Sequence, residues 1–314
     1  SREKERPPLA AASPRPVWRR GENRMKSRRS EVTAAAVLIA PFVIAYLVLF
    51  IYPTIKMVEL TFTNAPLIGE GTWTGVQNYI RLWNDRQFWS ALWNTLYFVL
   101  LTVIPNTVIG LLIAMMVSRL KGWLQSVILA CFFLPYILPV SVVTLIWQWV
   151  LDPQFGIGQY ALEFFVGDRV PVFRSRSWIM PTVAFVTIWW TCGFNVLLFL
   201  AGLRNISPEY YDAAALDGAG RWRQFVHITL PLIWPVGALV LTIQLILQLK
   251  IFDQLYLLTL GGATNTTMVL VQAIYRQAFA LNKGGYGATI ALALFVLIVA
   301  LSVLQYQFLR ARDR

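Results

Sequence analysis

Long apolar runs separated by short polar segments dominate this 314-residue chain. A helix rises 1.5 Å per residue, so about 20 apolar residues cross the roughly 30 Å of hydrocarbon in a bilayer. Six runs reach this length, and they cover residues 32–52, 90–117, 124–150, 179–203, 228–252 and 288–309. Lys250 is the only charged residue within them. The pattern predicts an all-α polytopic membrane protein with about six transmembrane helices.

The segment before the first run is rich in proline and arginine and poor in apolar residues. Residues 1–31 are therefore expected to form a disordered basic tail, followed by one membrane domain over residues 32–314. A basic stretch before an apolar run also resembles a secretory signal. The run over 32–52 is longer than the apolar part of a signal peptide, and no A-x-A cleavage site follows it, which favours a first membrane helix.

Composition agrees with a membrane location. Apolar residues make up 57% of the chain and charged residues only 13%, against about 25% charged in soluble domains. The net charge of +12 also suits a nucleic-acid-binding protein, but the positive charges lie between apolar runs rather than on one soluble face. They fit a topological interpretation better, because Lys and Arg hold loops in the cytoplasm.

The distribution of charge predicts the orientation. If the N-terminus is cytoplasmic, 18 of the 27 Lys and Arg residues fall in internal segments totalling 66 residues. The external segments total 100 residues and carry eight. Both termini are therefore predicted to be cytoplasmic.

The segment between the fourth and fifth runs carries the strongest local signals. Ser207 is a good N-cap and Pro208 suits a first helical position. Gly218 can adopt the left-handed conformation that ends a helix. A second short helix is expected to start near Ala219 or Gly220. The segment therefore predicts a helix–turn–helix elbow on the cytoplasmic face.

This elbow resembles the cytoplasmic loop of ABC importer permeases, which reads E-A-A-x-x-D-G-A, then a Phe six residues later, then I-x-L-P. The residues that match in register are Asp212, which replaces the usual Glu, and Ala213, Ala214, Asp217, Gly218, Ala219, Phe225, Ile228, Leu230 and Pro231. The resemblance implies a type I importer permease (MetI-like) bundle. It also implies that residues 208–224 form coupling helices that dock on a separate ATPase.

Shorter matches resemble the sugar-permease subgroup related to the maltose and glycerol-3-phosphate importers. They are Asn94-Thr95, Leu134-Pro135, Trp147, Phe252-Asp253, Tyr256-Leu257-Leu258-Thr259 and Gly261-Gly262. The resemblance implies one half of an alternating-access pathway for a sugar or sugar derivative in the bacterial inner membrane. It implies as partners a second permease, two ATPase copies and an extracytoplasmic solute-binding protein. An anionic solute such as glycerol phosphate is the alternative within this class.

Polar side chains within the apolar runs are candidates for the solute pathway, because polar groups in hydrocarbon tend to face a bundle interior or a cavity. The candidates are Asn106, Gln148, Asn195, Gln244, Gln248 and Asp253, together with Trp189 and Trp190, whose rings suit sugar C–H surfaces. The alternative is that the amides join helices to one another. Lys250 and Asp253 are three residues apart, so they either pair or leave Lys250 for an anionic solute.

Other functions are disfavoured. A secondary transporter usually carries acidic residues at the bilayer midplane, and the second to sixth runs have none. An intramembrane enzyme is disfavoured because the sequence shows no nucleophile paired with a general base. His227 is the only histidine, so a metal site is not expected either. The chain has no G-x-x-x-x-G-K-[ST] loop, so ATP and Mg²⁺ are expected in the partner ATPase and no cofactor in this chain.

Overall fold

The computed structural model describes residues 34–259 and 267–310, with side chains through residue 307. These residues divide into two units, with the boundary between Met57 and Val58. The predicted tail over residues 1–31 lies outside the described residues. The first candidate span, Ala34–Leu60, includes the π-helical turn η1 (Leu47–Ile51) and α2 (Tyr52–Leu60). It runs eight residues beyond the predicted end at residue 52.

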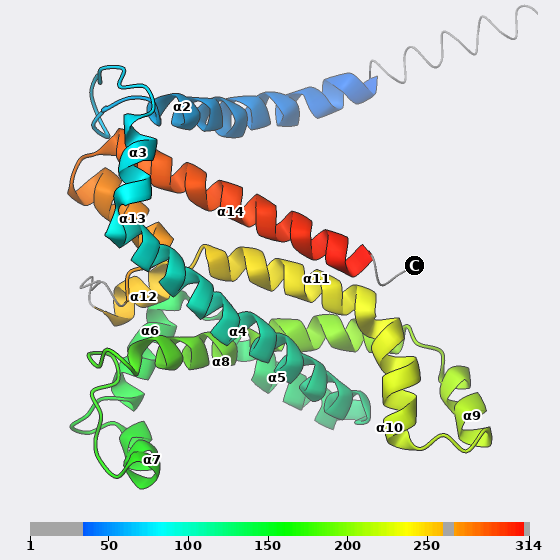
Figure 1. Ribbon diagram of the computed structural model, residues 1–314. Coiled ribbons are helices and arrows are strands. Elements are labelled where there is room, and N and C mark those ends of the chain that lie inside the picture. The colour runs from blue at the N-terminus through cyan, green and yellow to red at the C-terminus, as the bar shows by residue number, and fades with distance from the viewer. Residues whose placement is uncertain (1–33, 260–266, 311–314) are drawn as a thin grey trace, which may run out of the picture. The chain divides into compact units, whose positions relative to one another are not determined.

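Within the described residues of the unit over 58–314, the regular elements are helices, apart from one isolated bridge between Thr63 and Trp73; turns and loops connect them. Its first half contains α3 (Gln77–Asn84), α4 (Arg86–Ser118), α5 (Gly122–Ile137), α6 (Val140–Val150), α7 (Ile157–Val166) and α8 (Ile179–Arg204). Its second half contains α9 (Pro208–Leu216), α10 (Arg221–Gln224), η2 (Phe225–Thr229), α11 (Leu230–Leu249), α12 (Asp253–Leu258), α13 (Leu270–Tyr275), η3 (Arg276–Ala280) and α14 (Gly284–Arg310). The short elements α9 and α10 lie at the opposite end of α4, α8 and α11 from α12 and α13 (Figure 1).

Five helices in the described residues are long and apolar enough to cross a membrane, and a bent pair makes a sixth if it is one span. The expectation of about six membrane helices is therefore confirmed. The predicted ranges 90–117, 179–203 and 288–309 correspond to α4, α8 and α14. The range 228–252 corresponds to a longer helix, Arg221–Leu249, that begins inside the elbow.

The prediction of a single helix over residues 124–150 is wrong. This range holds two helices, α5 and α6, bent by 102° at a short break. Leu138 is extended, with ψ of 137°, and Pro139 caps α6. A residue before proline is pushed out of the α region, and proline has no N–H to continue the helix, so the break follows from the Leu138-Pro139 pair.

Three clusters of buried apolar side chains hold the unit together, and α4 contributes to all three. Phe88 packs with residues of α13 and α14, including Leu270 and Ile290. Phe98 packs with residues of α8 and α12, and Val117 packs with residues of α8 and α11. Helix α4 is therefore the element against which the others are positioned.

Glycines allow two close approaches on α8. A Cβ at Gly193 would overlap the backbone carbonyl of Phe132 in α5, and one at Gly202 would lie 2.6 Å from Ile233 Cδ1 in α11. Small residues at such crossings let membrane helices pack closely. At Gly193 the obstacle is backbone, which has little freedom to move aside.

We expect Gly193→Ala to destabilise the protein by about 1–3 kcal/mol, because the added methyl group overpacks the crossing of α5 and α8. Gly237→Ala on α11 is the matched control, because its Cβ would meet only Phe199 Cε1 at 3.8 Å. Both changes raise helix propensity equally. Thermal unfolding in detergent should show a lower Tm for Gly193→Ala alone, and equal Tm values would contradict this account of the crossing.

Candidate coupling site and polar core

Helix α9 begins and ends as its sequence predicts. Ser207 caps it by accepting a hydrogen bond from the Glu209 N–H at 3.4 Å, and Pro208 occupies the first helical position. At the other end Gly218 is left-handed, with φ of +76°. The Gly218 N–H donates to the Ala215 carbonyl at 3.1 Å and the Ala219 N–H to the Ala214 carbonyl at 2.9 Å. This pair of bonds is a Schellman motif, which satisfies carbonyl groups at the helix end.

The second short helix of the elbow is part of a membrane span. Helix α10 begins after its N-cap, Gly220, and continues through η2 into α11, so that Arg221–Leu249 is one helix of 29 residues. The expectation of a separate second helix is corrected here: no break follows Phe225. A displacement of the elbow therefore acts directly on the end of a membrane helix.

Side-chain contacts tie α9 to this long helix. Gln224 Nε2 donates to the Ala219 carbonyl at 3.1 Å and to the Tyr211 carbonyl at 3.5 Å. The Tyr211 hydroxyl lies 3.0 Å from Thr229 Oγ1. Because Thr229 is buried within the unit, this contact fixes α9 against the first turns of the helix Arg221–Leu249.

The elbow presents large apolar side chains outside the cores of the unit. Leu216 is 91% exposed, Trp222 75% and Tyr210 57%. Of the residues predicted to couple, Asp212, Ala213, Asp217 and Gly218 are exposed, while Ala214, Ala219 and Phe225 are half-buried. The sequence analysis did not select Tyr210, Leu216 and Trp222. Their signal was the presence of bulky apolar residues in a segment predicted to lie outside the membrane.

A second group, the polar core, joins α4, α8, α11 and α12 inside the unit. It consists of Asn106, Thr187, Thr191, Asn195, Gln244, Gln248 and Gln254, all buried. Gln248 Nε2 donates to Gln244 Oε1 at 3.1 Å, Gln244 Nε2 to Asn195 Oδ1 at 2.8 Å, Asn195 Nδ2 to the Asn106 carbonyl at 3.4 Å, and Asn106 Nδ2 to Thr191 Oγ1 at 2.8 Å. Thr187 Oγ1 donates to Gln254 Oε1 at 2.6 Å.

Four of the predicted pathway residues are therefore bonded to one another. Asn106, Asn195, Gln244 and Gln248 are each at most 3% exposed. In this conformation Asn106, Asn195 and Gln244 join helices, which is the alternative the sequence left open, and Gln248 bonds to Gln244 within α11. Asn106 Oδ1 and Gln254 Nε2 have no hydrogen-bond partner, so the polar core keeps an acceptor and a donor unused. Contact with a solute stays a prediction.

The other four predicted pathway residues lie apart from the polar core. Trp189 makes an edge-to-face contact with Trp147, and Trp190 donates to the Leu138 carbonyl at 3.2 Å. Gln148 donates to the Leu257 carbonyl at 3.1 Å and lines a cavity of about 680 Å³. Asp253 is exposed at the start of α12, and no ion pair joins it to Lys250 in this part of the chain.

The cavity beside Gln148 combines rings with polar groups. Its lining includes Trp149, Asp152, Phe173, Arg174 and Thr259. Of these, only Thr259 belongs to a sequence match; the others follow no spacing rule, and the lining comes from three segments. A volume of this size falls within the range of small-molecule sites.

Four aromatic rings surround the end of α11. Phe252 stacks on Tyr256 with centroids 5.2 Å apart, and Tyr275 stacks on Phe279 at 5.3 Å. Phe252 and Tyr275 join the two pairs at 5.4 Å. A hydrogen bond with Tyr275 raises the pKa of Tyr256 above its ordinary value.

Comparison with known proteins identifies the family. Residues 106–314 match the model of the binding-protein-dependent transport system inner membrane component. The chain therefore belongs to this family of membrane transport components.

Two curated relatives and one solved structure cover nearly the whole chain. The sulfoquinovosyl glycerol transport system permease of Agrobacterium fabrum is 30% identical, over 89% of this chain and 91% of its own. The arabinooligosaccharides transport system permease of Bacillus subtilis is 32% identical, over 88% of each chain. A chain of a bacterial alginate ABC transporter, solved in complex with a periplasmic protein that holds an alginate pentasaccharide, has the same fold. Its TM-score is 0.80 at 24% identity, over 92% of this chain and 98% of its own.

We expect Gln244→Met to lower stability by about 1–2 kcal/mol, because it leaves Asn195 Oδ1 and Gln248 Nε2 without partners. Gln154→Met is the control, since the Gln154 side chain is exposed. Thermal unfolding in detergent measures both. A Tm for Gln244→Met equal to that of the control would show that the polar core contributes nothing to helix packing.

Proposed function

We propose that this chain is one of two membrane-spanning subunits of an ATP-driven importer for a sugar or sugar derivative. The observation that supports this proposal most strongly is the structure of the elbow, residues 208–224. There a capped, exposed helix joins the end of a membrane helix through a glycine turn. Membership of the binding-protein-dependent family supports the proposal. It also disfavours the alternative of an ion-gradient-driven secondary transporter.

The elbow converts closure of an ATPase dimer into movement of membrane helices. The exposed Leu216, Trp222 and Tyr210 supply an apolar contact with the ATPase, and Asp212 and Asp217 supply charges at its edge. Because Arg221–Leu249 is continuous, a push on α9 tilts or shifts the helix that carries Gln244 and Gln248. The two permeases thereby alternate between inward-facing and outward-facing states.

A sugar-type solute fits the chemistry near the pathway. Amides and tyrosine hydroxyls bond sugar hydroxyls, and aromatic faces cover sugar C–H surfaces. Asn106 Oδ1 and Gln254 Nε2 are unpartnered, and Phe252, Tyr256, Tyr275 and Phe279 cluster at the end of α11. The names of the relatives add support, since they refer to a sulfoquinovosyl glycerol and to arabinooligosaccharides.

Partner proteins perform the remaining tasks. A separate ATPase dimer binds ATP and Mg²⁺, and a homologous permease forms the second half of the pathway. An extracytoplasmic binding protein binds the free solute. The alginate transporter was solved with such a periplasmic protein. The excess of Lys and Arg in the segments between α4 and α5 and around the elbow supports cytoplasmic termini in the inner membrane.

We expect Gly218→Thr to separate ATP hydrolysis from uptake. A β-branched residue at φ of +76° carries strain of about 1–2 kcal/mol, which is relieved by unwinding the last turn of α9 and displacing Leu216. Uptake by the reconstituted importer should fall about tenfold, the equivalent of 1.4 kcal/mol, while the subunit still inserts and assembles. Measuring ATPase activity and uptake in the same proteoliposomes separates the two effects.

Gly220→Thr is the matched control. Gly220 has φ of −67°, open space around its Cβ position and an N-cap role that threonine fills well. Its uptake should stay close to that of the native importer. Full uptake by Gly218→Thr would contradict the role assigned to the elbow.

The solute class is tested through the partner binding protein. The melting temperature of the purified binding protein is measured with one candidate solute at a time. The candidates are monosaccharides, oligosaccharides, sugar glycosides, glycerol phosphate and amino acids. A ligand present at 100 times its Kd stabilises a protein by about 2.7 kcal/mol, which shifts the Tm by several degrees. We expect such a shift with a sugar or glycoside, and a shift with amino acids alone would refute the proposed class.

A further inference from the structure

Helix α7 turns an apolar stripe away from the rest of the chain. Ile157 is 76% exposed, Tyr160 60%, Phe164 84% and Phe165 83%. Their spacing of i, i+3, i+7 and i+8 places them on one face of the helix, with Ala161 between them. A helix that packs on its own protein turns this stripe inward. The stripe of α7 faces outward.

On the side opposite the stripe, α7 carries its one buried residue, Gln159. Gln159 is 1% exposed, and its Nε2 donates to the Leu151 carbonyl at 2.7 Å and to the Val170 carbonyl at 2.9 Å. The Val170 N–H donates back to Gln159 Oε1 at 3.2 Å. An amide therefore occupies the position that an apolar residue fills in most amphipathic helices. This inversion indicates that the surroundings of the stripe are apolar.

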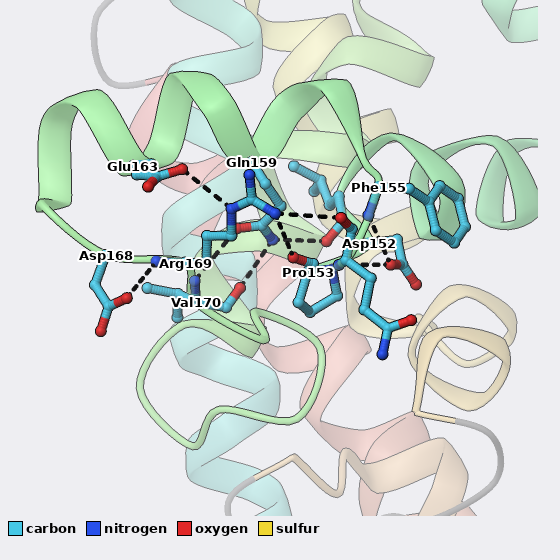
Figure 2. A network of polar contacts seen from close by, with 10 residues as sticks. Asp152, Pro153, Phe155, Gln159, Glu163, Asp168, Arg169 and Val170 are labelled. Carbon is cyan, nitrogen blue, oxygen red and sulfur yellow. Dashed lines mark hydrogen bonds and ion pairs between the residues drawn. The ribbon is translucent and has the colours of Figure 1, made fainter.

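Further polar contacts fix the segment that carries α7 (Figure 2). Arg169 Nε donates to Glu163 Oε2 at 3.1 Å, and its Nη1 donates to the Gln154 carbonyl at 3.2 Å. The bond to Glu163 raises the pKa of the Arg169 guanidinium. Asp152 accepts from the Gln154 N–H at 2.8 Å. The outward orientation of Phe164 and Phe165 is thus held by a network rather than by a loose loop.

The end of α6 sets the position of α7 relative to the membrane. A Cβ at Gly158 would lie 2.8 Å from Leu151 Cδ2 and 2.9 Å from the Val150 carbonyl, so the first turn of α7 packs on the last turn of α6. Helix α6 has its own exposed apolar stripe at helical spacing: Val142, Leu145, Ile146 and Trp149, the last 65% exposed. Tryptophan is enriched where membrane helices meet the headgroup layer. The stripe of α7 therefore directly follows the exposed apolar stripe of a helix that belongs to a candidate membrane span.

From this continuity we propose that α7 lies along the membrane interface and inserts its Ile157–Tyr160–Phe164–Phe165 stripe among the phospholipids. Its ten residues rise about 15 Å, too little to cross about 30 Å of hydrocarbon. An amphipathic helix in this layer buries its apolar face about 5–10 Å into the boundary between headgroups and acyl chains. Tyr160 and the neighbouring Arg169 supply polar groups for the headgroup side. The function of α7 is to anchor the α6–α8 connection at a fixed depth.

The test uses the whole importer reconstituted in phospholipid nanodiscs. Spin labels are placed at Phe164→Cys and Phe165→Cys in a background of Cys131→Ser and Cys192→Ala. Gln154→Cys and Asp168→Cys are the controls, since both side chains are exposed and polar. Power saturation compares collisions of each label with oxygen, which concentrates in lipid, and with a water-soluble nickel chelate.

We expect oxygen to exceed the chelate at positions 164 and 165, by at least about threefold relative to the controls. Two outcomes overturn the proposal. Chelate access at 164 equal to that at 168 would place the stripe in water. Low access of both reagents together with an immobilised spectrum would place it against a protein subunit. The same purified importer is also reconstituted in liposomes, where its uptake is measured. Uptake tests the proposed function and the label accessibilities test this inference, so the two can fail separately.

A second measurement covers the case in which the labelled variants do not assemble. Phe164→Trp exchanges one ring for another and leaves the polar face of α7 intact. Phospholipids brominated near the carbonyl groups should quench the added fluorescence more strongly than the average tryptophan of the native protein. Added fluorescence that these lipids leave unquenched would contradict the proposal.

Discussion

The need to satisfy buried amides without water organises the centre of this protein. An unpaired amide in hydrocarbon costs several kcal/mol, so each helix that carries one must find a partner. The contacts from Gln244 through Asn195 to Asn106 join α11, α8 and α4, the same helices that share a buried apolar cluster. The crossing of these helices is therefore specified by hydrogen bonds as well as by packing.

A single helix joins the elbow to the polar core. Arg221–Leu249 is one helix, with the glycine turn at one end and Gln244 and Gln248 near the other. At 1.5 Å per residue these 29 residues extend about 43 Å along the helix, which includes the π-helical turn η2 and Pro235. The exposed Leu216 lies outside this helix, on α9, which hydrogen bonds of Tyr211 with Thr229 and Gln224 tie to it.

The end of the unit away from the elbow follows different packing rules. There α7 buries an amide and exposes phenylalanines, and the cavity beside Gln148 mixes rings with charged groups. Both features make sense when the surroundings change from lipid to headgroups to water over a short distance.

The sequence by itself determined the features that depend on neighbouring residues. The length of apolar runs predicted the spans, and Ser207, Pro208 and Gly218 predicted the ends of α9, because caps and turns are local. Proline was less informative: Pro105 and Pro135 lie inside intact helices, whereas Pro139 lies at the break where α5 and α6 bend by 102°. Only tertiary structure decided which amides pair, since Asn106 and Thr191 are 85 residues apart, and which face of α7 turns outward. Those choices depend on where distant helices pack, and no local spacing encodes that.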